Sequence, residues 1–276
     1  MRELTLKEIQ EGNFKVLCKI KEICEENGLK YFLAFGTLLG AVRHSDYIPW
    51  DDDVDVWMPR EDYEKFVNYC IDNEEKIKPF VLKHYKTCKE YIYPIGRFCD
   101  GRYYLDYKDT KDYGLGLFVD IYPMDGIDLT DKKYVKALIK KRDLIGRCCY
   151  SRFVPNKNPI KTLIKFPYYH LRLKHVDTNS KIAEIDRLAR KYDYASSEFV
   201  QNLTWETDKK PMKKEWFGDG KTMLEFHGVK FSVPDNYKAW LETNYGDYMT
   251  LPPEEKRVPT HNYRAYLKEE YEGKKQ

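Results

Sequence analysis

Three aspartates at alternate positions, Asp51, Asp53 and Asp55, give the sequence its clearest chemical signal. A strand over residues 51–57 would place all three carboxylates on one face, with neighbours about 6.5–7 Å apart. Like charges at that spacing raise each other's pKa and destabilise the fold unless a cation neutralises them. Carboxylate oxygens suit Mg²⁺ or Mn²⁺, and Mg²⁺ is commonly held together with substrate phosphates. The pattern therefore predicts metal-assisted phosphate chemistry. The alternative is an acidic loop that merely precedes the next helix.

Gly36 and Thr37 stand where a short apolar strand, residues 31–35, is expected to turn into a helix. Backbone N–H groups and the positive end of the helix dipole at such a turn suit a phosphate. The same dipeptide also serves ordinary strand-to-helix turns. However, a Gly-Thr turn, a short helix and a strand with alternating aspartates together form the layout of metal-dependent nucleotidyltransferases.

That layout needs a further acid on a neighbouring strand. Asp120 supplies one, amid β-branched and aromatic residues of an expected strand over residues 117–122. A buried lone aspartate is rare without a partner, so we expect Asp120 to face the same metal. An aspartate that caps a strand end is the alternative. Asp125, which follows Pro123, is expected in a turn.

The run GTLLGAVRHSDYIPWDDDVDVWMPREDYEKF (residues 36–66) closely resembles the signature of the LicD family of phosphocholine transferases, which also includes the fukutin-related transferases. The resemblance continues at FVDIYPMDG (residues 118–126) and returns in the last third of the chain. The match to the family is weak over residues 132–199. The matching positions of the last third are Trp216, Phe217, Phe226, Val233, Pro234, residues 245–249, Pro252, Pro253 and His261.

The resemblance implies an α+β, nucleotidyltransferase-like mixed sheet flanked by helices, with an inserted basic helical segment. It also implies transfer of phosphocholine from CDP-choline to a hydroxyl of a surface glycan or its lipid-linked precursor, of the teichoic acid or lipopolysaccharide type. CMP would leave. By position, the acids that bind Mg²⁺ (or Mn²⁺) and carry catalysis would be Asp51, Asp53, Asp55 and Asp120.

Other residues are assigned to the donor by their place in the same motifs. For most of them a surface or packing role is the alternative. Trp50 and Trp57 bracket the acids and are candidates for contact with a choline ammonium, which binds aromatic rings. The candidates for contact with the donor phosphates are Gly36, Thr37, Arg43, His44, Arg97, Arg257 and His261.

Three other functions remain open. The same chemistry could use CDP-ribitol, CDP-glycerol or CDP-ethanolamine. A nucleotidyltransferase acting on a small molecule would share the acids but release pyrophosphate instead of CMP. A non-catalytic binding module could keep the fold, although the acids at every expected position speak against it.

Composition bounds the class of protein. With 276 residues, 42% hydrophobic and 15% aromatic, the chain can bury a full core and is not a disordered sequence. Its seven scattered cysteines favour reduced thiols in a cytoplasm. The polar first residues lack the apolar core of a signal peptide, and the longest apolar stretch, residues 31–42, is too short to span a bilayer. We therefore expect a cytoplasmic protein, at most peripheral on the inner face of the plasma membrane.

The charge is unevenly distributed along the chain. Residues 132–174 hold thirteen Lys and Arg against one acid, Asp143, a net of +12; because the whole chain carries +3, the remainder carries −9. This segment is either a solvated surface or a contact for an anionic membrane or acceptor polymer. It lacks the signature of an RNA-binding module, so a nucleic-acid partner is not expected.

The remaining elements must position these residues. A capping box at Thr5 and Glu8 starts a first helix, which Asn27 and Gly28 end. The expected domains are a catalytic core over 1–130, a basic helical insertion over 131–199 that contains a proline-rich loop, and a part over 200–276 that completes the catalytic domain. Further helices are expected over 60–71, 131–147, 180–192 and 235–244, and strands over 81–85, 93–99, 117–122, 223–226 and 229–233.

Overall fold

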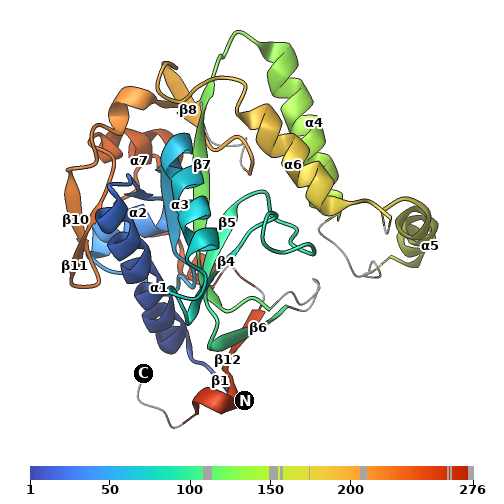
Figure 1. Cartoon of the computed structure of the whole chain (residues 1–276), viewed down its shortest axis with the longest axis horizontal. Helices are drawn as coiled ribbons and strands as arrows, with labels where there is room; N and C mark the ends of the chain where they lie inside the picture. Colours follow the sequence, from blue (N-terminus) through green and yellow to red (C-terminus); the bar gives the residue numbers. More distant parts are fainter. Residues whose placement is uncertain are drawn as a thin grey trace.

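A seven-stranded mixed sheet lies at the centre of the described part of the chain (Figure 1). The computed structural model describes residues 1–107, 114–148, 155, 158–173, 175–205, 210–259, 261 and 263–272, with the backbone alone at 144–148 and 172–173. The main strand order is β2 (Phe32–Leu33), β3 (Asp55–Pro59), β7 (Leu117–Ile127), β5 (Gly96–Asp100) and β4 (Phe80–Lys83). β8 (Phe199–Gln201) pairs with the end of β7, and β9 (Met212–Lys213) pairs with β8.

Most of these strand pairs are antiparallel, and β3 and β7 run parallel. A smaller sheet joins the two ends of the chain, because β12 (Tyr263–Leu267) lies between β1 (Arg2–Glu3) and β6 (Tyr103–Tyr107). The hairpin of β10 (Met223–Phe226) and β11 (Val229–Ser232) forms where the sequence predicts it. With helices on a mixed sheet, the α+β prediction is confirmed.

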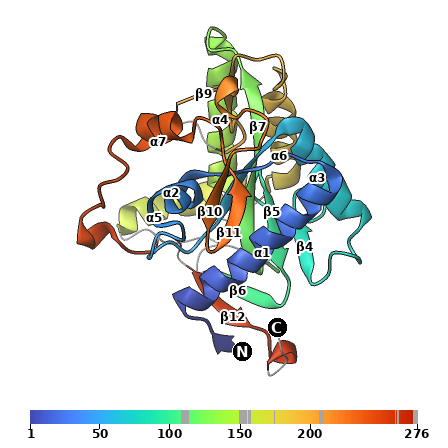
Figure 2. The same ribbon diagram turned by 90° about the vertical axis from the view of Figure 1, so that its left-hand side faces the viewer.

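Helices flank the central sheet. α1 (Leu6–Asn27) has the capping box predicted at Thr5 and ends at Gly28, which is left-handed. It packs against β5 and β7, and Figure 2 shows it lying across the sheet near the β10–β11 hairpin. α2 (Phe35–His44) contacts β3 and β10, and α3 (Arg60–Asp72) contacts β3 and β7. α7 (Tyr237–Tyr245) buries Trp240 beside Trp57, with ring centroids 4.8 Å apart.

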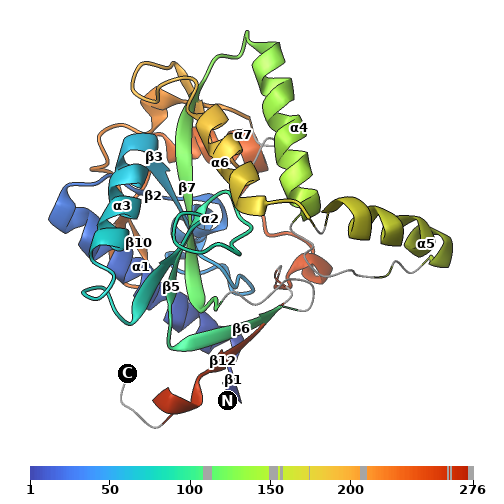
Figure 3. The same ribbon diagram turned by 45° about the vertical axis from the view of Figure 1, so that its right-hand side comes forward.

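A second helical layer lies beside the C-terminal end of β7. α4 (Lys132–Cys148) packs on α6 (Thr178–Ala189) around a small apolar cluster that includes Ile127 and Leu138. In the sequence, α5 (Pro159–Tyr168) and the π-helical turn η1 (Tyr169–Leu173) lie between α4 and α6. In space they project from the body of the molecule (Figure 3). Among the described residues, no helix is both long enough and apolar enough to cross a bilayer.

Three predictions about local structure were wrong. The strand expected over 51–57 begins only at Asp55, because side chains rather than a strand partner bind the carbonyl groups of residues 51 and 52. Asp125 lies inside β7 and is buried, not in a turn. Part of the expected proline-rich loop is α5: Pro159 occupies its first turn, where a missing N–H costs no hydrogen bond.

Candidate active site

Three strands bring two acids and a base into one row. In the parallel pairing of β3 and β7, Asp55 lies beside Asp120, and in the antiparallel pairing of β5 and β7, Arg97 lies beside Asp120. Partners in register point to the same face of a sheet, on strands about 4.8 Å apart. All three side chains are buried. The sheet itself therefore fixes the order Asp55, Asp120, Arg97.

Arg97 holds Asp120 rather than projecting from the surface. Its Nε donates to Asp120 Oδ1 at 2.6 Å and its Nη2 to Oδ2 at 3.3 Å. The guanidinium carbon lies 3.9 Å from the ring centroid of Tyr93 and 4.2 Å from that of Phe118, so two aromatic rings fix the plane of the group. Burial alone would lower the pKa of Arg97, but the charge of Asp120 raises it, so the base stays protonated.

Residues 51–53 form a loop whose backbone is fixed by side chains from both ends of the sequence. From α1, Gln10 Nε2 donates to the carbonyl oxygen of Asp51 at 2.8 Å, and Asn13 Nδ2 donates to that of Asp52 at 3.1 Å. The hydroxyl of Tyr263 on β12 donates to the same Asp52 oxygen at 3.0 Å. The acids therefore keep a defined arrangement without strand pairing.

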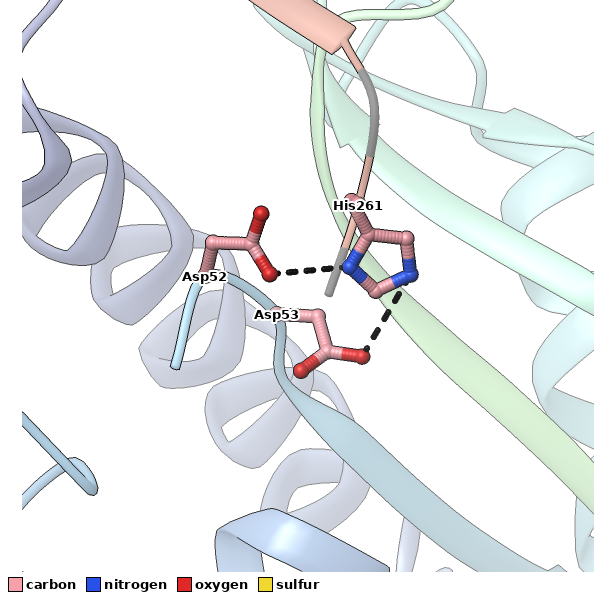
Figure 4. A group of neighbouring side chains, drawn as sticks. All are labelled: Asp52, Asp53 and His261. Carbon is pink, nitrogen blue, oxygen red and sulfur yellow. Dashed lines mark hydrogen bonds and ion pairs between the residues drawn. The ribbon is translucent and has the colours of Figure 1, made fainter. Parts of the chain in front are cut away.

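His261 closes this loop from the C-terminal part of the chain. Its Nδ1 lies 2.9 Å from Asp52 Oδ1 and its Nε2 lies 3.7 Å from Asp53 Oδ2, as Figure 4 shows. Burial alone would lower the pKa of His261, but Asp52 and Asp53 outweigh burial and raise it above its ordinary value. The imidazolium form is therefore favoured, and it offsets part of the negative charge of the loop.

Three of these aspartates have raised pKa values. Burial, followed by the carboxylate of Asp53, raises the pKa of Asp51 to about 8. Burial also raises the pKa of Asp53. At Asp55, burial and then the charges of Asp53, Asp120 and Asp51 raise the pKa well above its ordinary value. Groups perturbed by both burial and charge partners are typical of functional sites.

This set of residues fits a divalent cation. The Oδ1 atom of Asp55 is buried and has no hydrogen-bond partner among the described residues. Potential ligand atoms of Asp52, Asp53 and His261 lie within 4.8 Å of one another. A buried acceptor without a donor is costly in a folded protein, and a metal ion at this place would satisfy it. The site can therefore hold a metal among its carboxylates.

The start of α2 contacts the acidic loop directly. A Cβ atom at Gly36 would lie only 2.7 Å from Asp51 Oδ2, so any larger residue here would push this carboxylate aside. Thr37 is buried, and its Oγ1 accepts a hydrogen bond from the backbone N–H of Asp55 at 2.9 Å. The predicted phosphate turn thus lies against the predicted metal acids.

We expect Gly36→Ala to lower the turnover number about a hundredfold while the melting temperature changes little. The new methyl group displaces the Asp51 carboxylate, and misplacement by about 1 Å can cost that much activity. Gly40→Ala is the matched comparison in the same helix: its methyl group would meet the backbone oxygen of Asp46 at 2.6 Å, which cannot move away, so it should lower the melting temperature. Thermal unfolding and initial rates of both variants separate the two effects.

The other residues that the sequence assigns to the donor differ in what they contact and in how deeply they are buried. Arg257 lies with its guanidinium carbon 5.8 Å from the ring centroid of Trp50, so this residue of the C-terminal tail lies near the tryptophan that precedes the acidic loop. Arg43 donates from Nη1 to the carbonyl oxygen of Tyr248 at 3.0 Å, and burial lowers the pKa of the adjacent His44. Trp57 is fully buried among core aromatic rings, so it offers no exposed face to a choline group.

Two contributors were missing from the sequence-based set. In the expected strand over residues 51–57, alternation would place Asp52 on the face opposite Asp51, Asp53 and Asp55, but in the loop its carboxylate binds His261. Tyr122 follows Asp120 by two residues on β7, and its hydroxyl donates to Asp120 Oδ2 at 3.4 Å. The period of two along a strand could have indicated Tyr122, because Asp120 and Tyr122 share a face. No sequence signal marks the loop position of Asp52.

Comparison with known proteins identifies the family of the chain. Residues 28–145 match the family described as LicD/FKTN/FKRP, nucleotidyltransferase domain. The chain is 31% identical over 277 residues to the lipopolysaccharide cholinephosphotransferase LicD of Haemophilus influenzae, which covers 97% of this chain and 100% of that protein. A stretch of 40 residues is 52% identical to human ribitol 5-phosphate transferase FKRP, 14% of this chain and 8% of that protein. The first of these relatives spans both the acidic loop and the tail that carries His261, and on this basis the chain belongs to the LicD family.

Proposed function

We propose that this protein transfers phosphocholine from CDP-choline to a hydroxyl of a surface glycan or of its lipid-linked precursor, releasing CMP. One observation carries the proposal. The row Asp55–Asp120–Arg97 contains one buried acceptor, Asp55 Oδ1, and one buried donor, Arg97 Nη1, with no hydrogen-bond partner among the described residues. A cation beside a diphosphate would supply both missing partners. The full-length relative named as a cholinephosphotransferase supports choline as the alcohol.

We assign Mg²⁺ or Mn²⁺ to the carboxylates of Asp51, Asp53, Asp55 and Asp120. Hard oxygen ligands suit these ions, whereas imidazole is more typical of zinc, so His261 is assigned to orienting Asp52 and Asp53. A bound divalent ion would neutralise the charge that develops on the departing CMP. Both Asp120 oxygens already accept hydrogen bonds from Arg97 or Tyr122, so we assign Asp120 to metal binding and not to removal of the proton from the acceptor hydroxyl.

We assign residues 1–130 and 200–276 to one catalytic domain and residues 131–199 to an insertion in it. The pairing of β8 with β7 and of β12 with β6 supports this division, because the last part of the chain extends both sheets. We place the protein in the cytoplasm, bound to the inner face of the plasma membrane, where a lipid-linked acceptor would be reached. The free cysteines Cys24, Cys70 and Cys99 are compatible with a reducing compartment.

A thermal-shift panel tests the donor. With Mg²⁺ present, we expect CDP-choline to raise the melting temperature more than CDP-ethanolamine, CDP-glycerol, CDP-ribitol, CTP or ATP. A ligand that binds only the folded state stabilises it by about 2.7 kcal/mol at a hundredfold excess over Kd. Chelation should abolish the shift. Stabilisation by CTP or ATP alone, with pyrophosphate rather than CMP as product, would identify a nucleotidyltransferase instead.

CDP-ribitol is the second candidate donor, because the chain is also similar over 40 residues to FKRP, named a ribitol 5-phosphate transferase. The two donors differ in the group beyond the diphosphate: choline offers a quaternary ammonium, and ribitol offers hydroxyls. Trp50 is partly buried, and the guanidinium carbon of Arg257 lies 5.8 Å from its ring centroid. If Trp50→Leu weakens CDP-choline more than CDP-ribitol, an aromatic contact with the ammonium is supported.

A further inference from the structure

An exposed apolar surface on α5 has no partner among the described residues. Of the large apolar side chains on this helix and the turn after it, six are between 44% and 76% exposed, and five of them, all but Phe166, lie on one side. No residue of α5 is buried, and its main packing contact is with η1, its own continuation. Figures 1 and 3 both show the helix projecting away from the sheet. We call this surface the α5 apolar face; it consists of Ile160, Leu163, Ile164, Tyr168 and Leu171.

The spacing of these residues places them on one side of the helix. The steps from Ile160 to Leu163, to Ile164 and to Tyr168 are three, four and eight residues, which is the period of an amphipathic helix. Lys161 and Lys165 border this stripe, three residues before Ile164 and Tyr168 respectively. Such a stripe normally faces a protein core. Here it faces outward, and contiguous exposed apolar patches mark interaction sites.

The charges around the α5 apolar face favour an anionic partner. The described part of 158–173 contains Lys161 and Lys165 and no acidic residue. Helix α4, which precedes α5 in the chain, adds a set of basic side chains, of which Lys141 pairs with Glu184 of α6, and a single acid, Asp143. The described basic side chains of α4 are Lys132, Lys133, Lys136, Lys140, Lys141 and Arg142. A second copy of the chain would bring the same positive charges against this region, which opposes self-association.

We propose that α5 is an interfacial anchor: its apolar face inserts into the acyl region of an anionic bilayer, while Lys161 and Lys165 beside that face contact lipid phosphates. Helices with one apolar side, a basic side and interfacial aromatic rings bind membranes in this way. With 10 residues, α5 spans about 15 Å and lies in the membrane plane rather than across it. The inference rests on the proposed function for its purpose, namely to hold the active site near a lipid-linked acceptor.

Vesicle flotation tests the anchor without any donor. We expect the full-length protein to float with phosphatidylcholine vesicles that contain about a quarter phosphatidylglycerol. The variant Ile160→Ser/Leu163→Ser/Ile164→Ser should bind these vesicles about tenfold more weakly or worse, and its melting temperature should be unchanged, because none of these side chains is buried. The matched control replaces three exposed apolar residues elsewhere, Ile71, Leu129 and Met223, by serine and should float like the unmodified protein.

Two further measurements identify the kind of contact. In Leu163→Trp, the emission of the new indole should shift to shorter wavelength with vesicles and be quenched by brominated acyl chains. Lys161→Gln/Lys165→Gln should weaken binding to anionic vesicles more than to neutral ones. Flotation of the triple serine variant at the unmodified level would overturn the proposal. So would loss of a soluble oligomer in that variant, which would assign the face to self-association, or selective loss of binding to an acidic peptide.

The proposed function and the anchor can fail separately. Release of CMP with a soluble acceptor should be the same for the triple serine variant and the unmodified protein, because α5 contributes no residue to the acidic loop. If CDP-choline fails to bind but flotation behaves as expected, the donor assignment falls and the anchor stands. If CMP release occurs but the unmodified protein does not float, the anchor is overturned alone.

Discussion

Asp55→Asn is expected to lower phosphocholine transfer by about a thousandfold or more without destabilising the protein. The substitution keeps the shape of the side chain but removes a carboxylate that interacts electrostatically with Asp53, Asp120 and Asp51. Because burial and these charges raise the pKa of Asp55, its ionised form destabilises the folded protein above the pKa of the unfolded chain. In the metal-free protein, the melting temperature of the variant should therefore be equal to or higher than that of the unmodified protein.

Mg²⁺ titrations complete this experiment. The unmodified protein should gain stability with Mg²⁺, because the ion offsets repulsion among the carboxylates, and Asp55→Asn should gain less. The contact between Thr37 and the backbone of Asp55 does not involve the carboxylate and should persist. A variant that loses activity and also unfolds at a lower temperature would mean that Asp55 is structural. A variant that keeps more than a tenth of the activity would remove Asp55 from the catalytic set.

Arg60→Met is expected to lower the free energy of unfolding by about 3–5 kcal/mol while leaving the catalytic constants of the folded enzyme unchanged. Arg60 is buried at the start of α3 and donates to both oxygens of Asp125 on β7, at 2.7 and 2.6 Å. It also donates to Asp186 of α6 at 2.8 Å. Burial raises the pKa of Asp125 even beside this base, so removal of the base leaves an acid that is expensive to keep buried.

Urea unfolding of a small set of variants checks this prediction. Arg190 contacts Asp186 and Glu64 from a partly exposed position, so Arg190→Met should cost about 1 kcal/mol or less. Arg60→Met/Asp125→Leu should recover part of the loss, because it removes the unpaired charge. Activity should survive in all of them: Asp125 lies five residues beyond Asp120, about 16 Å along β7. A loss below about 1 kcal/mol for Arg60→Met would contradict a central role for this buried network.

The proximity of Asp55 and Asp120 could be anticipated from sequence because each lies in a short apolar segment of a recognisable motif. Their exact partners could not. Arg97 was assigned to phosphate, but its position beside Asp120 depends on the antiparallel register of β5 with β7, which no local pattern specifies. Asp52 was placed on the wrong face because the alternation argument assumed a strand, whereas hydrogen bonds from Gln10 and Asn13 create a loop.

The helix α5 and the network at Arg60 could not be predicted from the sequence, because prolines suggested a loop or a turn at both places. Prolines within residues 155–167 indicated a loop, but a proline in the first turn is compatible with a helix, and Pro167 lies near its last turn. Asp125 follows Pro123, which suggested a turn, and only the pairing of β7 with β3 and β8 shows that the strand continues through it. For Asp125 the long-range pairing of β7 decided the structure, whereas for α5 the position of each proline within the helix did.

The contact between His261 and Asp52 has a consequence for the order of synthesis. The two residues are 209 positions apart, so at roughly 5–20 residues per second a ribosome makes the histidine about 10–40 s after the aspartate. During that interval the nascent chain carries its cluster of acids without the group that offsets their charge. Tyr263, which supports the same loop, is made just after the histidine. The acidic centre therefore acquires its full set of contacts only after residue 263 has been made, however early the surrounding strands and helices form.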